Sequence, residues 1–163
     1  MTTTPWLGIV LLAIADLLGG EWLGEGLDNP LGRLLALAIL TIASAILAAL
    51  LARPGWRRRL VAGISIGALA CLGFWSGDRI ATRAFNSCVE RGEEVRVALA
   101  EHKSRTGRYP ASLHELGSAI PGARALRANI LVYEPRADGY ALSFSDWLVT
   151  HSATERGEWL VAK

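Results

Sequence analysis

The sequence lacks the side-chain patterns that mark common enzyme and cofactor sites. Its two cysteines and three histidines have no metal-ligand spacing, and a zinc site needs at least three converging protein ligands. No Gly-x-Ser-x-Gly nucleophile elbow occurs. The pair Gly19–Gly20 lacks the lysine and the strand-to-helix setting of a phosphate-binding loop. We therefore expect a protein without enzymatic activity, metal or cofactor.

Charge is missing from two long stretches. Leu34–Ala52 and Leu60–Gly77 are 19 and 18 residues long and contain no Asp, Glu, Lys or Arg. A helix of about 20 apolar residues crosses a hydrocarbon core of about 30 Å, so both stretches predict transmembrane helices. Most of the charge follows them, because residues 77–163 carry twenty-three charged side chains and residues 1–76 carry nine. This split excludes a simple soluble globule and a disordered chain.

A weaker candidate span covers Pro5–Leu23, which contains Asp16, Glu21 and two glycines. We predict that it forms a third transmembrane helix. One alternative is an uncleaved signal-like segment, which is disfavoured because no Lys or Arg precedes Trp6. A second alternative is a helix that lies in the membrane interface.

The loops between these spans differ in charge. Residues 53–59 include four arginines, whereas residues 20–30 include three acids and no base. Short loops rich in Lys and Arg stay in the cytoplasm. The pattern predicts a membrane protein whose N-terminus is cytoplasmic and whose residues 78–163 lie on the other side of the membrane. We expect two parts: residues 1–59, with two transmembrane helices and a basic cytoplasmic loop, and residues 60–163.

The apolar half contains four candidate interaction residues. Asp16 within a span costs about 2.5–3.5 kcal/mol on insertion scales, and such residues often mark proton or ion paths. The alternative is that Asp16 or Glu21 lies near the outer surface and pairs with Arg33. Gly63 and Gly67 form a Gly-xxx-Gly pattern that lets helices approach closely. Their partner is either the chain's own first two helices or a second copy of the chain.

The third span is predicted to continue as an amphipathic helix. No proline and only one glycine occur from Asp78 to Arg105. Apolar and small residues recur there at steps of three and four, which places them on one helix face. Residues 60–105 therefore predict one long helix, and its apolar stripe needs a partner to cover it. The stripe comprises Ala81, Phe85, Cys88, Gly92, Val95, Leu99 and His102.

A short helix is expected after the long one. Gly107 suits the left-handed position at a helix C-terminus. Ser112 and Glu115 then have the spacing of a capping box, in which the hydroxyl and the carboxylate each accept from a backbone N–H. This spacing predicts a short helix over residues 112–118.

The last third of the chain predicts a small antiparallel sheet. Its apolar residues alternate with polar ones, and Asp138-Gly139 favours a hairpin turn. The fold class is thus membrane-anchored α+β: three transmembrane helices, with the third continuing into a long helix that packs on a three-stranded antiparallel sheet. Strands are expected over residues 129–134, over 140–145 with an extension to 149, and over 158–162, with a turn at 135–139.

A helix that starts in the membrane, continues outside it and meets a small antiparallel sheet resembles a type IV pilin or a type II secretion pseudopilin. The run from Ala98 to Leu116 is similar to the pseudopilin segment in which a helix ends at Thr-Gly-x-Tyr-Pro and a short Ser-Leu-x-x-Leu helix follows. Asp138-Gly139-Tyr140-Ala141-Leu142 also resembles the family's strand entry. The resemblance covers about residues 60–150 and implies a pilin-like fold.

The sequence departs from that family in two ways. A prepilin has a leader that ends in glycine, with glutamate five residues further on, whereas Leu60 stands fifth after Gly55. The pseudopilin calcium loop is also not evident, since Asp138 and Asp146 are isolated. The resemblance therefore implies a fixed pilin-like module held in a bacterial inner membrane, with residues 78–163 in the periplasm, and accessory to a secretion or type IV pilus system. The alternative is a small transporter subunit with a regulatory outer domain.

Four residues beyond the membrane are further interaction candidates. Cys88 lies on the apolar stripe, so its thiol is either buried or available for an intermolecular disulfide. Arg105, Arg108 and Tyr109 belong to a group of basic and aromatic residues of the kind that binds DNA. Acids dilute the bases of this half, so no nucleic-acid partner is expected. The expected partners are the lipid bilayer and another envelope protein. Association with further copies of the same chain is an alternative.

Overall fold

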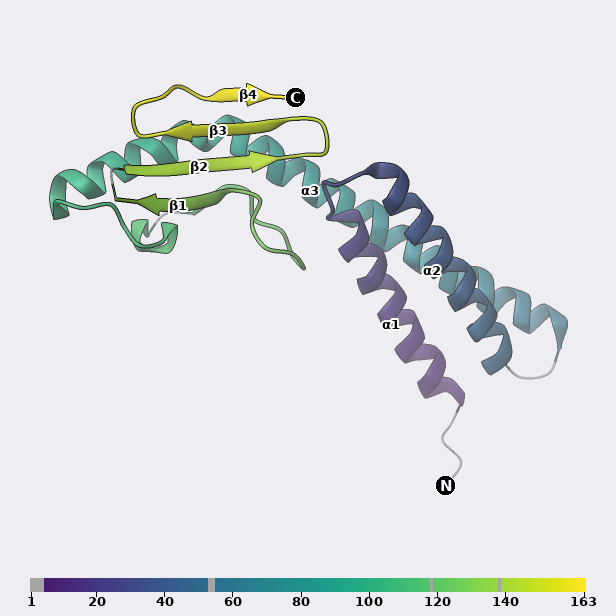
Figure 1. Ribbon diagram of the computed structural model, residues 1–163. Helices are drawn as coiled ribbons and strands as arrows, with labels where there is room; N and C mark the ends of the chain where they lie inside the picture. Colours follow the sequence, from purple (N-terminus) through teal and green to yellow (C-terminus); the bar gives the residue numbers. More distant parts are fainter. Residues whose placement is uncertain (1–4, 53–54, 118, 138) are drawn as a thin grey trace. The chain divides into compact units, whose positions relative to one another are not determined.

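The computed structural model describes residues 5–52, 55–117, 119–137 and 139–163. The chain divides into two compact units, one that extends to Ile80 and one that runs from Ala81 to Lys163. The first unit contains helices and the second contains the sheet (Figure 1). One helix, α3, has residues in both.

The helical unit consists of α1 (Pro5–Gly24), α2 (Pro30–Leu51) and the first part of α3 (Trp56–Thr106). All three helices are long and apolar enough to cross a membrane. Asn29 caps α2, because its side chain accepts a 3.0 Å hydrogen bond from the N–H of Leu31. The helices that the sequence predicts from its apolar stretches are therefore present, the weaker first one included.

Four glycines bring α1 and α3 into backbone contact. We call Gly20, Gly24, Gly73 and Gly77 the glycine seam. A Cβ built on any of them would lie 2.1 Å from a carbonyl oxygen of the other helix, far inside van der Waals contact. Only glycine therefore permits this approach, as at close helix crossings in membranes. The oxygens opposite them belong, in order, to Ala70, Phe74, Leu17 and Glu21.

In the sheet unit, α3 continues to Thr106 without a break in its helical assignment. Its predicted apolar stripe is confirmed. Ala81, Cys88, Val95 and Leu99 are all 8% exposed or less. Of the other members of the stripe, Gly92 is buried, and Phe85 and His102 are half-buried. The period of three and four thus identified the face of α3 that the sheet covers.

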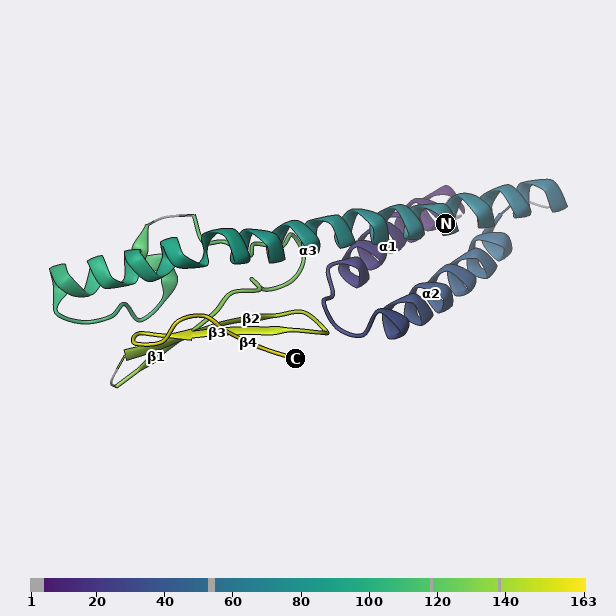
Figure 2. The same cartoon turned by 90° about the horizontal axis from the view of Figure 1, so that it is seen from above.

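The sheet has four strands in the order β1-β2-β3-β4, and each pairs antiparallel with the next. The prediction of three strands is therefore wrong. Figures 1 and 2 show the strands running alongside the part of α3 that belongs to this unit. The strands are β1 (Val132–Arg136), β2 (Gly139–Ser145), β3 (Thr150–Thr154) and β4 (Leu160–Ala162).

The missed boundary is a turn between β2 and β3. The carboxylate of Asp146 accepts hydrogen bonds from the N–H groups of Leu148 and Val149, at 2.8 and 2.7 Å. The N–H of Asp146 donates to the carbonyl of Val149 at 3.0 Å. The chain therefore reverses where the sequence indicated an extension of the strand.

The other predicted boundaries change less. Strand β1 begins later than expected and includes Pro135, which pairs with Tyr140. A sheet edge tolerates proline because no ladder hydrogen bond is lost there. The expected hairpin turn includes Asp138, which lies outside the described residues.

The predicted helix over residues 112–118 is a 3-10 helix, η1 (Leu113–Leu116). The expected capping box does not form, because Glu115 accepts from the residue before the cap and not from Ser112 itself. The carboxylate of Glu115 accepts from the N–H of Ala111 at 3.1 Å, but the hydroxyl of Ser112 makes no capping bond. Gly117 ends the turn in the left-handed conformation, with φ of 67°.

An aromatic cluster joins the sheet to α3. Phe144 of β2 stacks on His151 of β3 with ring centroids 4.6 Å apart. Phe85 of α3 and Trp159 meet Phe144 edge-on, at 5.5 and 5.3 Å. A Cβ at Gly92 would lie 2.8 Å from the indole of Trp159, so this glycine leaves room for the ring. Such aromatic contacts add to the burial of apolar area.

Candidate functional site

Asp16 is enclosed within the helical unit. It is 1% exposed, and its Oδ1 accepts a 2.6 Å hydrogen bond from the hydroxyl of Ser44 on α2. Its Oδ2 is buried and has no hydrogen-bond partner among the described residues. The alternative that places Asp16 at the outer surface beside Arg33 is therefore wrong. Asp16 lies eight residues before the end of α1, which is about 12 Å along the helix axis.

Arg33, near the start of α2, instead contacts the end of α1 and a residue in the middle of α3. Its Nη1 donates to the carbonyls of Gly24 and Gly26, at 3.0 and 2.6 Å. The same nitrogen lies 3.6 Å from Oδ1 of Asp78, and the guanidinium lies 5.9 Å from the ring centroid of Phe74. Carbonyls at a helix C-terminus have no partner within the helix and attract cations. Arg33 therefore fixes the start of α2 against the end of α1.

Gly63 and Gly67 lie against the chain's own second helix. A Cβ at Gly63 would lie 3.3 Å from the carbonyl of Ala45, and one at Gly67 would lie 2.9 Å from the methyl of Thr41. Both glycines are buried. Of the two alternatives for this motif, the structure places it in contact with α2 of the same chain.

Cys88 is a buried free thiol. It is 1% exposed, and Gly122 packs on it so closely that a Cβ there would lie 2.6 Å from the sulfur. Gly122 has φ of 86°, and its N–H donates to the hydroxyl of Ser87. Cys71 is also free but exposed. An intermolecular disulfide through Cys88 would require the residue 122 loop to leave its place.

Tyr109 belongs to the packing of the sheet unit. Its ring meets that of Tyr140 edge-on, with centroids 5.0 Å apart. The ammonium of Lys103 lies 4.5 Å from the Tyr109 ring centroid and 2.7 Å from Oε1 of Glu155. Arg105 and Arg108 are exposed. Of these three candidate residues, only Tyr109 is packed against neighbouring side chains.

The groups around the ion pair between Lys103 and Glu155 have shifted pKa values. Hydrogen bonds from Lys103 and then from Tyr109 hold the pKa of the Glu155 carboxyl below its ordinary value. Desolvation, followed by the nearby Glu155, raises the pKa of Tyr109. Both shifts favour the charged carboxylate and the neutral phenol at neutral pH.

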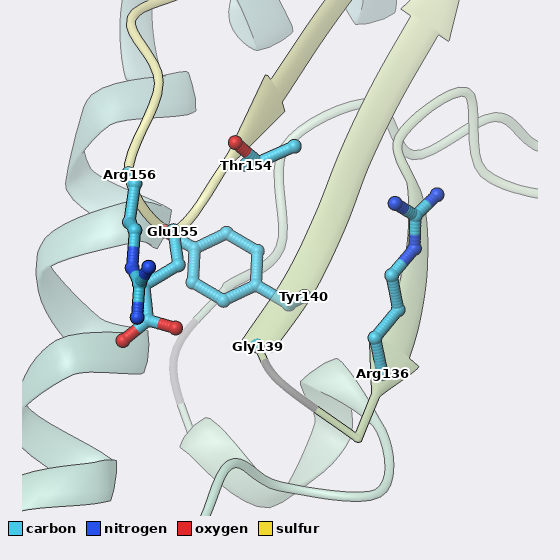
Figure 3. A pocket seen from close by; sticks show the side chains of 6 residues that line it. All are labelled: Arg136, Gly139, Tyr140, Thr154, Glu155 and Arg156. Atoms are coloured by element: carbon cyan, nitrogen blue, oxygen red, sulfur yellow. The ribbon is translucent and has the colours of Figure 1, made fainter.

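A pocket that the sequence did not reveal lies beside this ion pair. Its volume is about 180 Å³. In Figure 3, Arg136 of β1 lies on one side and Glu155 and Arg156 of the β3–β4 connection lie on the other. Its lining residues are Arg136, Gly139, Tyr140, Thr154, Glu155 and Arg156.

The pocket was missed because its residues come from separate strands. Only the strand register, in which Arg136 pairs with Gly139 and Ala141 pairs with Thr154, brings the two segments together. The one sequence signal is the pair of turns that flank β2.

The described part of the chain contains no group of three or more His, Cys, Asp or Glu side chains placed to hold a metal ion. No protein-family model matches the sequence, and no curated protein or solved structure matches it either.

Proposed function

We propose that the chain is a non-enzymatic inner-membrane protein that displays a pilin-like α+β unit for binding another envelope protein. Its N-terminus would lie in the cytoplasm and residues 78–163 in the periplasm. The observation that carries the proposal is the change in surroundings along α3. Its first part is apolar enough to cross a membrane, and its later part is covered by an antiparallel sheet. This is the architecture that the resemblance to pilins and pseudopilins implies.

The charges of the helical unit support this orientation. Arg57, Arg58 and Arg59 lie in the first turn of α3 and are exposed. The opposite end of the unit carries acids, of which Asp78 lies beside Arg33. Short basic segments stay in the cytoplasm. The start of α3 would therefore lie on the cytoplasmic side, and the residues that follow its membrane span would lie on the opposite side.

The sheet unit also exposes apolar side chains that a binding partner would cover. Trp147 and Leu148 of the β2–β3 turn are 54% and 55% exposed. Leu160 and Val161 of the edge strand β4 are 69% and 59% exposed. Edge strands with unpaired backbone groups are ready sites for pairing with another chain. A natural partner class, by analogy with pilin-like proteins, is a component of a secretion or type IV pilus system.

The proposal is tested by co-purification from native membranes after gentle detergent extraction. A variant with Leu160→Asp alters the exposed edge strand, and Val97→Asp alters an exposed site on α3 as its matched control. We expect a secretion or pilus component to accompany the wild type and the V97D protein and to be lost with L160D. Recovery of the wild-type chain as a lone monomer would overturn the proposal.

A second candidate function is that of a small transporter subunit with a regulatory outer unit. Asp16 favours it, because a buried carboxylate with an unpartnered Oδ2 within a membrane span is costly. Replacing Asp16 by Asn would then abolish ion flux in proteoliposomes. For a scaffold, D16N would leave the co-purification unchanged. The absence of flux with the wild-type chain would exclude this candidate.

A further inference from the structure

One face of the sheet is free of α3. Strand residues directly opposite each other share a face, so Phe144, His151 and Val161 point to the face of the aromatic cluster. The neighbouring row points the other way, to what we call the outer face. That row consists of Val132, Ser143, Ser152 and Leu160.

Two of the residues that line the pocket, Arg136 and Thr154, lie on this outer face, whereas Glu155 pairs with Lys103 of α3. Arg136 is two positions beyond Glu134, which pairs with Ala141, and Ala141 pairs with Thr154. These residues therefore belong to the outer face. The pocket and the row that contains Val132 and Leu160 are thus adjacent along the strands. In that row two small serines separate two exposed apolar side chains.

The charge around the pocket is basic. Arg136 and Arg156 lie at its two rims (Figure 3). Glu155 is already paired with Lys103 at 2.7 Å, and Glu134 lies 3.8 Å from Arg136 at an exposed site. The charged side chains that line the pocket are thus two arginines and one carboxylate, and that carboxylate is already paired with a lysine outside the pocket. Guanidinium groups bind carboxylates in a bidentate geometry.

The size of the pocket limits its occupant. A volume of about 180 Å³ is smaller than the roughly 300–1,000 Å³ of typical small-molecule sites. It suits a single side chain rather than a cofactor. The adjoining row of serines and exposed apolar residues gives an extended chain further contacts, which a free phosphate or a lipid headgroup would not use.

We propose that this pocket binds an acidic side chain of an extended peptide segment of the partner protein, which lies across the outer face. Arg136 and Arg156 hold the carboxylate, and the row with Val132 and Leu160 contacts apolar residues that flank it. This inference rests on the proposed function and names the chemistry of the partner.

The test is selection of a random decapeptide phage library on the full-length protein in nanodiscs of phosphatidylcholine. We expect Asp and Glu to be enriched in the selected peptides. The variants Arg136→Gln and Arg156→Gln should each weaken their binding about tenfold. Arg83→Gln removes an exposed arginine of α3 outside the pocket and should change binding less than twofold. Circular dichroism establishes that each variant is folded.

Three results would overturn the inference. Selected peptides without acidic enrichment, or equal binding to R156Q and R83Q, would exclude a carboxylate in the pocket. Complete competition by phosphatidylglycerol vesicles would assign the pocket to lipid headgroups. If one of these results is found but an envelope protein still co-purifies, only the peptide-binding role of the pocket is refuted. If no envelope protein co-purifies, the proposed function itself is refuted.

Discussion

The hydroxyl of Ser44 lies 2.6 Å from Oδ1 of Asp16 and links α2 to α1 inside the helical unit. Both side chains are 5% exposed or less. A buried carboxylate requires such a donor, because an unpaired polar group in an apolar surrounding costs free energy. The contact therefore fixes how the first two helices pack on each other.

Ser44→Ala removes the one hydrogen bond described for the Asp16 side chain. We expect it to lower the free energy of unfolding by about 1–2 kcal/mol. Thermal unfolding in detergent micelles, followed by circular dichroism, measures the change. Ser65→Ala, at an exposed serine of α3, is the control and should have little effect. Equal stability of S44A and S65A would mean that the contact does not stabilise the unit.

The glycine seam predicts a larger effect. Gly73→Ala places a methyl group where the carbonyl oxygen of Leu17 lies, so α1 and α3 must move apart. We expect a loss of about 3 kcal/mol, at the upper end for overpacked sites. Gly32→Ala is the matched control, since a Cβ at Gly32 meets nothing within 4 Å. A G73A protein as stable in micelles as G32A would refute the close approach.

The ion pair between Lys103 and Glu155 makes the sheet unit sensitive to acid. Because the pKa of Glu155 is lowered in the folded protein, its stabilisation is present above the ordinary value of about 4.5 and is lost as the pH falls. Glu155→Gln should lower the unfolding temperature at about pH 7, and the difference from wild type should shrink as the pH falls below the ordinary value of the carboxyl pKa. Near-ultraviolet circular dichroism of the aromatic cluster measures the unfolding temperatures of the wild type and of E155Q at each pH. A difference that persists at low pH would contradict this origin.

The burial of Cys88 predicts slow alkylation. In a Cys71→Ser background, N-ethylmaleimide should modify Cys88 about 100-fold more slowly than an exposed thiol, because the loop around Gly122 must first open. Ala100→Cys, at an exposed position of α3, supplies that reference when both native cysteines are replaced. Mass spectrometry counts the adducts. Similar rates for the two thiols, or a covalent dimer through Cys88, would show that the thiol is accessible.

Much of the helical architecture follows from the sequence, because burial repeats with the period of the helix. The stripe from Ala81 to His102 is an example, since its spacing alone identified the covered face. The glycine seam carries the same kind of signal. Gly20-xxx-Gly24 and Gly73-xxx-Gly77 have the spacing that singled out Gly63 and Gly67, but they stand beside acids and at the ends of spans, where the pattern is less evident.

Other features depend on register that a single sequence does not reveal. Trp147 and Leu148 are apolar, so they indicated a continuing strand, whereas the carboxylate of Asp146 turns the chain. The bond between Asp16 and Ser44 requires the relative position of two helices. The pocket between Arg136 and Arg156 requires the pairing of three strands. Long-range pairing decides each of these cases, and local patterns do not contain it.

The central claim is that α3 crosses the membrane and that the residues after it lie on the periplasmic side. Labelling with a membrane-impermeant maleimide tests it in cells whose outer membrane is permeabilised. Single cysteines replace Trp56 and Glu101, both exposed, after removal of the native cysteines. The account predicts that the Glu101→Cys protein is labelled in these cells and that Trp56→Cys is labelled only after the inner membrane is disrupted. The reverse pattern, or labelling of both sites before disruption, would contradict it.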